Sequence, residues 1–218
     1  MSIRTQSILI VASVLLVVGF LFYAGLDNFR MDYSEDQYTL ADEGYVYSLI
    51  SPDKRHELPG TLREISGLTW LGQQTLACVQ DEDGIVFFLN VVSGQIEREV
   101  TFAGKGDYEG IAHKGDSIYV LRSDGVIFAF EDNREHKQKA EKIPTALSGS
   151  NNAEGLDFNP FDEGLLIACK DKPGIDIVHD GRALYTMPLH RGQNDSIYLK
   201  VLILSEEYND LLQQRGLN

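Results

Sequence analysis

The sequence is poor in the residues that mark several classes of protein. Its 218 residues include only two cysteines, and 19 Lys and Arg stand against 33 Asp and Glu, which gives a net charge of −14. A protein that binds along a nucleic-acid backbone needs clustered Lys and Arg, so this composition excludes nucleic acid as a partner. The same charge argues against docking of the folded part on an anionic lipid surface.

The sequence also lacks the short motifs of several enzyme classes. It contains no Gly-x-Ser-x-Gly elbow, phosphate-binding loop, dinucleotide fingerprint or Cys–His nucleophile arrangement. None of the five histidines pairs with another at ligand spacing. His113 is the one candidate general base near the repeats described below, although its place at the end of a strand explains it as well. These absences leave open whether the protein is an enzyme.

What the sequence does contain is a repeat. Three copies, aligned on a glycine, read SGLTWLGQQTLACVQDEDGIVFFLN, EGIAHKGDSIYVLRSDGVIFAFE and EGLDFNPFDEGLLIACKDKPGIDIVHD. The aligned glycines Gly67, Gly110 and Gly155 are 43 and 45 residues apart, the length of one four-stranded propeller blade. Short runs rich in Val, Ile, Phe and Tyr alternate with Gly, Asp and Asn turns, without a helical period. The sequence therefore predicts an all-β fold, a β-propeller-type repeat of four-stranded blades.

Residues 44–204 form this predicted domain. We expect one strand at Tyr45–Ile50, four strands in each copy and a last strand at Ser196–Leu204, about three and a half blades in all. For the third copy the predicted strands are Ala153–Phe158, Gly164–Lys170, Ile175–His179 and Arg182–Met187. Closed propellers typically have 4 to 8 blades. The chain is therefore a truncated product, an open arc, a partial ring that a partner completes, or a minimal four-bladed ring.

The N-terminal region has the pattern of a membrane anchor. Residues 8–26 contain no charge, and as a helix they span roughly 28 Å, close to the hydrocarbon thickness of a bilayer. Arg4 precedes this run and several acids follow it, so the bulk of the chain should lie outside the cytoplasm. We predict an anchor at residues 1–27 and an acidic tether at 28–43. A cleaved signal peptide is the alternative, but its apolar core is usually shorter and ends in small residues.

A short helix is predicted at the C-terminus, over residues 205–218. Ser205 is a suitable N-cap, and Glu206 and Glu207 suit the first turn of a helix. If the blades form an open arc, its exposed edge strand invites self-association, and this helix is placed to cover such an edge.

Several motifs, in order, carry a resemblance to a known family. The segments ELPGTLREISGLTW, VQDEDG, GDYEGIA, LRSDG and NAEGLDF are similar to those of the SdiA-regulated (YjiK-like) family of bacterial envelope proteins. The resemblance covers roughly Tyr45 to Lys172, and after Lys172 the chain departs from it because further blades would be expected. It implies a β-propeller behind an N-terminal membrane segment, in the periplasm at the bacterial inner membrane, and it supplies no catalytic residues.

Three glutamates make the candidate metal site. Glu64, Glu109 and Glu154 lie on the first strand of each copy, which lines the channel of a propeller, and we interpret them as sharing one register. Carboxylates that converge repel one another, so one of them keeps a proton or a cation lies among them. Oxygen ligands without histidine favour Ca²⁺ or Mg²⁺. The alternative is that each glutamate accepts hydrogen bonds from neighbouring backbone amides and joins the blades.

The two cysteines, Cys78 and Cys169, occupy equivalent strands of non-adjacent copies. They should lie too far apart for a disulfide, which requires Cα atoms within about 7 Å, so we predict two buried free thiols.

Together these features favour a membrane-anchored periplasmic binding module for an unknown small molecule or envelope protein, with a divalent cation on its axis. A metal-assisted phosphate or carboxylic ester hydrolase is the first alternative. The second is an incomplete propeller that assembles with another chain.

Overall fold

The computed structural model describes residues 52–174, 180–189, 196–205 and 209–210. By contacts the chain forms two units, Met1–Arg55 and His56–Asn218, and all the elements described below belong to the second. The predicted anchor at residues 8–26, the tether and the strand at Tyr45–Ile50 lie outside the described residues. No helix within the described ranges is both long and apolar enough to cross a membrane.

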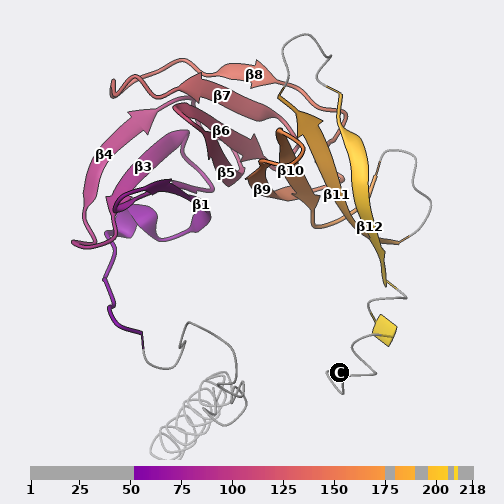
Figure 1. Cartoon of the computed structure of the whole chain (residues 1–218), viewed down its shortest axis with the longest axis horizontal. Helices are drawn as coiled ribbons and strands as arrows, with labels where there is room; N and C mark the ends of the chain where they lie inside the picture. The colour runs from indigo at the N-terminus through magenta and orange to yellow at the C-terminus, as the bar shows by residue number, and fades with distance from the viewer. Residues whose placement is uncertain (1–51, 175–179, 190–195, 206–208, 211–218) are drawn as a thin grey trace, which may run out of the picture. The chain divides into compact units, whose positions relative to one another are not determined.

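Three four-stranded antiparallel sheets make up the second unit, which confirms the all-β prediction and gives a propeller-like arrangement (Figure 1). We call them blades 1, 2 and 3. Each blade follows chain order, with one strand at the inner edge and one at the outer edge. Their bounds are β1 Ile65–Gly72, β2 Thr75–Gln80, β3 Ile85–Asn90 and β4 Ile96–Thr101 in blade 1; β5 Tyr108–Lys114, β6 Ser117–Arg122, β7 Ile127–Glu131 and β8 Glu141–Ile143 in blade 2; and β9 Ala153–Asn159, β10 Gly164–Cys169, β11 Gly181–Pro188 and β12 Tyr198–Leu204 in blade 3.

The strands of the third blade differ from the prediction. The predicted strand at Ile175–His179 lies outside the described residues, and the third strand of the blade is β11. The last strand, predicted to begin a further blade, is β12 and pairs with β11 through Ala183↔Leu202 and Leu184↔Val201. The described residues therefore form three complete blades rather than three and a half.

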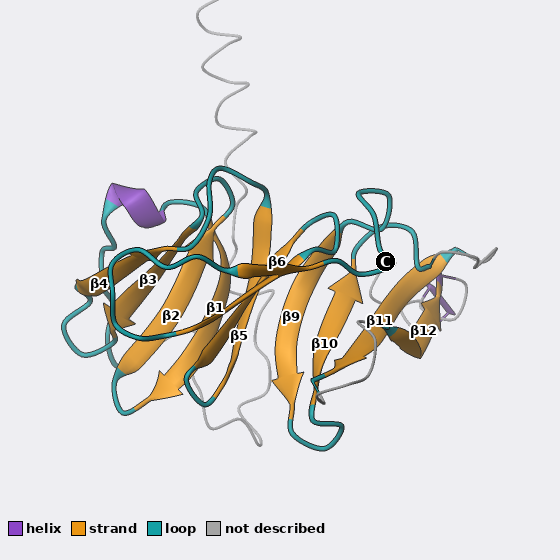
Figure 2. Ribbon diagram, turned by 90° about the horizontal axis from the view of Figure 1, so that it is seen from above, coloured by secondary structure: helices purple, strands orange, loops and turns teal. Residues whose placement is uncertain are grey.

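The inner strands β1, β5 and β9 contact one another, and the blades fan outward from them (Figures 1 and 2). The glycine of each repeat allows this close approach. A Cβ atom on Gly67 would lie 2.8 Å from Gly110 Cα, and one on Gly110 would lie 2.7 Å from Leu156 Cβ. Only glycine therefore fits where the inner strand of one blade meets the next.

Alternation along the strands gives each blade two faces. In blades 2 and 3, we call the face toward the preceding blade the front face and the opposite one the back face. In blade 1, the front face is the one that carries the residues corresponding to those front-face positions. Cross-strand pairing places three corresponding residues on the front face of every blade. These sets are Leu68, Cys78 and Phe87 in blade 1; Ile111, Val120 and Phe128 in blade 2; and Leu156, Ile167 and Tyr185 in blade 3.

Two hydrophobic clusters fill the spaces between the blades. The first joins the back face of blade 1 to the front face of blade 2, with Val79, Ile111 and Val120 fully or almost fully buried. The second joins blades 2 and 3 through residues such as Leu121 and Ile167. A third, smaller cluster lies on the front face of blade 1, where Leu62 of the 3₁₀ helix η2 (Gly60–Leu62) covers its outer part. Blade-to-blade burial is thus the main stabilising contact of the domain.

Both cysteines are free and buried, as predicted. Cys78 lies in the third cluster and Cys169 in the second. Burial raises the pKa of each thiol to about 11, so both are poorly reactive at neutral pH.

The helix predicted at residues 205–218 lies mostly outside the described residues.

Candidate functional site

Each inner strand contains a bulge near its start, just before the repeat glycine. The pairing skips Ser66 in β1, Glu109 in β5 and Glu154 in β9. A bulge leaves one residue outside the regular ladder and redirects its side chain, a feature often found beside functional sites. These three residues are therefore the structurally equivalent ones in the three blades.

The equivalent residue in blade 1 is thus Ser66, and Glu64 lies two positions earlier. Glu64 precedes β1, is exposed, and lines a cavity of about 310 Å³ on the front face of blade 1 together with Glu82 and Glu99. The difference arises because Glu64 stands three residues before its glycine, whereas Glu109 and Glu154 stand one residue before theirs. Ser66 instead donates a hydrogen bond from Oγ to the carbonyl of Tyr108 (2.6 Å), which joins blades 1 and 2.

Glu109 and Glu154 do interact electrostatically. Burial raises the pKa of Glu109 from 4.5 to about 7, and the negative charges of Asp107, Glu154 and Asp81 and a hydrogen bond with Asp107 add to the rise. Asp81 lies at the end of β2, and its Oδ1 atom is buried without a hydrogen-bond partner among the described residues. We call Asp81, Asp107, Glu109 and Glu154 the carboxylate cluster. Burial and the like charges of this cluster therefore favour the protonated form of Glu109.

Lys170 is the cation that the structure supplies to this cluster. Its Nζ atom donates a hydrogen bond of 2.7 Å to Glu154 Oε1, and Asn152 Nδ2 donates to the same oxygen at 3.2 Å. Among the residues that the structure describes, no group of three or more His, Cys, Asp or Glu side chains is arranged to hold a metal ion. The Ca²⁺ or Mg²⁺ site at Glu64, Glu109 and Glu154 stays a prediction.

His113 lies at the opposite end of β5 from Glu109. Its Nε2 atom donates a hydrogen bond of 2.9 Å to the carbonyl of Trp70, and its Nδ1 atom lies 3.4 Å from the carbonyl of Gly115. His113 and Glu109 are four positions apart along the strand, which corresponds to a distance of about 13 Å. His113 therefore joins blades 1 and 2 and does not act on the carboxylate cluster.

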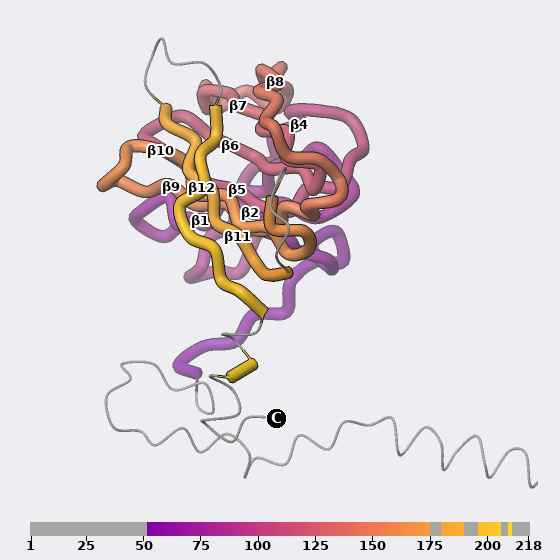
Figure 3. Tube along the Cα trace, turned by 90° about the vertical axis from the view of Figure 1, so that its right-hand side faces the viewer, coloured from indigo at the N-terminus to yellow at the C-terminus, as the bar shows by residue number. Residues whose placement is uncertain are grey.

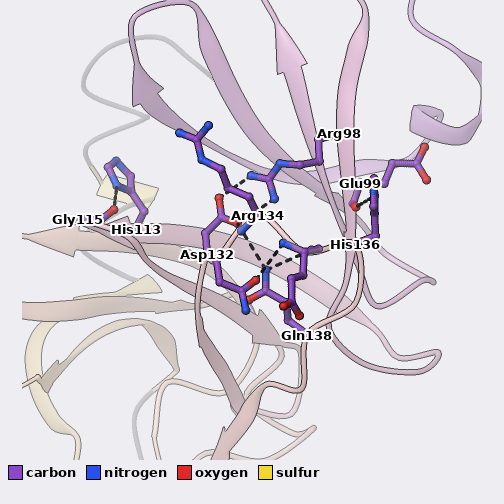
Figure 4. Close-up of polar contacts among 10 residues, drawn as sticks. Arg98, Glu99, His113, Gly115, Asp132, Arg134, His136 and Gln138 are labelled. Atoms are coloured by element: carbon purple, nitrogen blue, oxygen red, sulfur yellow. Dashed lines mark hydrogen bonds and ion pairs between the residues drawn. The ribbon is translucent and has the colours of Figure 1, made fainter.

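A groove between blades 1 and 2 was not predicted from the sequence. It has a volume of about 510 Å³, and Arg98 of β4 and Asp132 after β7 form part of its wall (Figure 4). Arg98 donates two hydrogen bonds to the Asp132 carboxylate, one of 2.8 Å, and its guanidinium lies 3.6 Å from the centre of the Phe88 ring. Asp132 also accepts from the backbone amide of Arg134 and from Gln138. Because both charged groups have hydrogen-bond partners, the main role of the pair is to position blades 1 and 2 relative to each other.

The two terminal blade faces carry most of the exposed apolar side chains. On the front face of blade 1, Leu68 is 62% and Trp70 49% exposed, and on the back face of blade 3, Val201 is 40% and Ile203 43% exposed. Within the described residues, no large hydrophobic side chain of blade 2 is exposed. No other described blade packs on the face that carries Trp70. The view from the side of blade 3 shows no described segment over β12 (Figure 3).

Within the described residues, this geometry defines a propeller-like domain of three blades, of which the first and the third carry exposed apolar side chains. No family model and no curated protein matches the chain. The fold is similar to part of the hydrazine synthase of Kuenenia stuttgartiensis, with a TM-score of 0.45 and 16% identity over 70% of this chain and 38% of that one. It is also similar to the Cps50 (Swd1) β-propeller domain of Myceliophteria thermophila, with a TM-score of 0.40 and 11% identity over 67% of this chain and 42% of that one. The chain thus spans about two fifths of the length of these structures, and the likeness concerns the fold alone.

Proposed function

We propose that the chain is a partner-binding module, and that a partner protein docks on the exposed apolar side chains of blades 1 and 3. One comparison carries the proposal. Leu68 and Ile111 occupy corresponding positions on the front faces of blades 1 and 2, yet Leu68 is 62% exposed and Ile111 1% exposed. The difference arises because blade 1 covers Ile111, whereas no other described blade packs on Leu68.

The chemistry of both faces suits an apolar sheet as the partner. Full burial of a large apolar side chain contributes about 1.5–3 kcal/mol. Docking would bury Leu68 and Trp70 on one face, and Val201 and Ile203 on the other. These side chains are exposed enough to contribute much of this free energy when they are buried. Exposed apolar patches of this kind commonly mark protein interfaces.

The proposal places this module in the bacterial envelope. Its support is the sequence: the uncharged run at residues 8–26, the acidic residues that follow it, and the motifs shared with the SdiA-regulated family. In this setting the anchor lies in the bilayer and the blades lie in the periplasm, where the partner would also be found.

Thiol labelling of a Leu68→Cys variant tests the proposal. Cys78 and Cys169 are buried, so a maleimide should react mainly with the introduced cysteine. We expect Leu68→Cys to be labelled several-fold more slowly in intact cells than in the purified, diluted chain. Phe161→Cys is the matched control, because Phe161 is 94% exposed in the turn after β9 and away from both faces. Equal relative labelling of the two variants in cells and in dilute solution would contradict the proposal.

A further inference from the structure

We infer that the groove between blades 1 and 2 binds a small zwitterionic molecule, an amino acid or a short peptide with both ends free. Its volume of about 510 Å³ lies within the range of about 300 to 1,000 Å³ that is usual for small-molecule sites. Within the described residues, none of the exposed apolar side chains of the proposed interface lines this groove. A ligand here is therefore separate from the partner protein proposed above.

The lining of the groove combines buried apolar side chains with an exposed polar rim. Phe88 and Ile118 are buried in the cluster that joins blades 1 and 2, and both line the groove. Three exposed residues form the rim: Gln73 in the turn between β1 and β2, Asp116 in the turn between β5 and β6, and Arg134 in the loop between β7 and β8. Apolar walls with a few polar groups are typical of sites that bind small molecules.

The backbone of Arg134 is held in place by the wall of the groove. Its φ of 66° lies in the left-handed region, which residues other than glycine seldom adopt. Its amide donates a hydrogen bond of 3.0 Å to Asp132 Oδ1, and Arg98 donates one of 2.8 Å to the same oxygen. This hydrogen-bonded turn fixes the point from which the Arg134 side chain extends (Figure 4). A ligand that binds Arg134 does not have to order the turn, which favours binding.

The rim carries two opposite charges that do not pair with each other. Arg134 bonds Asp132 through its backbone amide, and the Asp116 carbonyl accepts from the Asp132 amide at 2.8 Å. Among the described residues, however, neither the Arg134 guanidinium nor the Asp116 carboxylate has a hydrogen bond or an ion pair. A zwitterion can pair with both groups at once, its carboxylate with the planar guanidinium of Arg134 and its ammonium group with Asp116.

The other charged and titratable groups of the groove already have partners. Arg98 is paired with Asp132, and Glu97 Oε1 accepts a hydrogen bond of 2.8 Å from Asn90. His113 Nε2 is bonded to the carbonyl of Trp70. One cation and one anion are thus left for a ligand. An anion or a cation alone would leave one of these two charges without a partner, so the lining favours a zwitterion.

The test uses the full chain, purified in mild detergent, with leucine and the dipeptide alanyl-leucine as probes in isothermal titration calorimetry. We expect at least one probe to bind with a dissociation constant in the millimolar range or below. Arg134→Gln and Asp116→Asn should each weaken this binding about tenfold or more, because each removes a hydrogen bond between charged groups. Arg63→Gln, which replaces an exposed arginine of the blade 1 cavity, is the matched control and should bind like the parent.

The melting temperature shows whether these variants fold. Since neither replaced side chain has a partner among the described residues, we expect the melting temperatures of Arg134→Gln and Asp116→Asn to equal that of the parent. Weaker binding by a variant that melts like the parent then reports on the groove itself.

Blocked probes identify which rim charge pairs with which end of the ligand. The C-terminal amide and the N-acetyl form of the probe each lack one charge, so each should bind the parent about tenfold more weakly. Arg134→Gln should bind the probe and its amide equally, and Asp116→Asn should bind the probe and its N-acetyl form equally. No saturable binding of either probe, binding that neither variant weakens, or blocked probes that bind the parent as tightly as the free one would overturn the inference.

Discussion

The protonation of Glu109 affects the stability of the domain. In the folded chain its pKa is raised from 4.5 to about 7, first by burial and then by Asp107, Glu154 and Asp81. Between these two pH values the folded state binds more protons at this site than the unfolded state does. Stability from this group therefore falls as pH rises from about 4.5 to 7, and the full penalty is present above pH 7.

This gives a prediction for Glu109→Gln. The variant should be more stable than the parent at pH 8, by about 1 kcal/mol once the partial exposure of the side chain is discounted, because it removes an unfavourable charge. The gain should shrink toward pH 5. Urea unfolding at the two pH values measures it, with Glu141→Gln as a control on the exposed edge strand β8. A gain of the same size at both pH values would contradict the assigned pKa.

The cation prediction can be tested in the same way. If Ca²⁺ or Mg²⁺ binds at two of the three predicted glutamates, Glu109 and Glu154, millimolar Ca²⁺ should raise the melting temperature and a chelator should lower it. Because Glu64 lies on the front face of blade 1, Glu64→Gln should leave any such shift unchanged, whereas Glu154→Gln should abolish it. Identical melting with Ca²⁺ and with chelator would rule out this site.

At the scale of the elements, the inner strands depend on glycine. Gly67→Ala should destabilise the domain by about 1–3 kcal/mol, because its Cβ would lie 2.8 Å from the Gly110 backbone, which cannot move freely. Gly104→Ala is the matched control, since no atom lies within 4 Å of its Cβ position. Denaturant unfolding of both variants measures the difference. Equal stability would show that β1 and β5 are not in close contact.

The Arg98–Asp132 pair makes a second prediction for the contact between blades 1 and 2. Both side chains are mostly buried, at 20% and 16% exposure, so Arg98→Ala should cost about 1–3 kcal/mol by leaving the carboxylate without its partner. The double variant with Asp132→Ala should cost less than the sum of the two single changes. Strict additivity in a double-mutant cycle would show that the pair does not couple the blades.

The sequence was sufficient to predict most of the strands, because each copy carries the same glycine and the same alternation. In blade 3 it predicted the strand at Arg182–Met187 correctly but made it the fourth of the blade, whereas β11 is the third and pairs directly with β10. Composition does not show which strands pair, and pairing with β10 and β12 sets the place of β11 in the sheet.

The candidate site was predicted only in part. Glu109 and Glu154 were found because each directly precedes its glycine, but Glu64 was grouped with them by residue type, and the bulge position belongs to Ser66. The Arg98–Asp132 pair could not be predicted, because it joins residues 34 positions apart in different blades and has no local pattern.

At the scale of the whole molecule, the described residues form three blades, of which the first and the third carry exposed apolar side chains. The most direct test of a partner on blade 1 is maleimide labelling of Leu68→Cys in intact cells and in the purified, diluted chain, with Phe161→Cys as the control. The account predicts that Leu68→Cys is labelled several-fold more slowly in cells than in dilute solution. Equal relative labelling of the two variants under both conditions would contradict it.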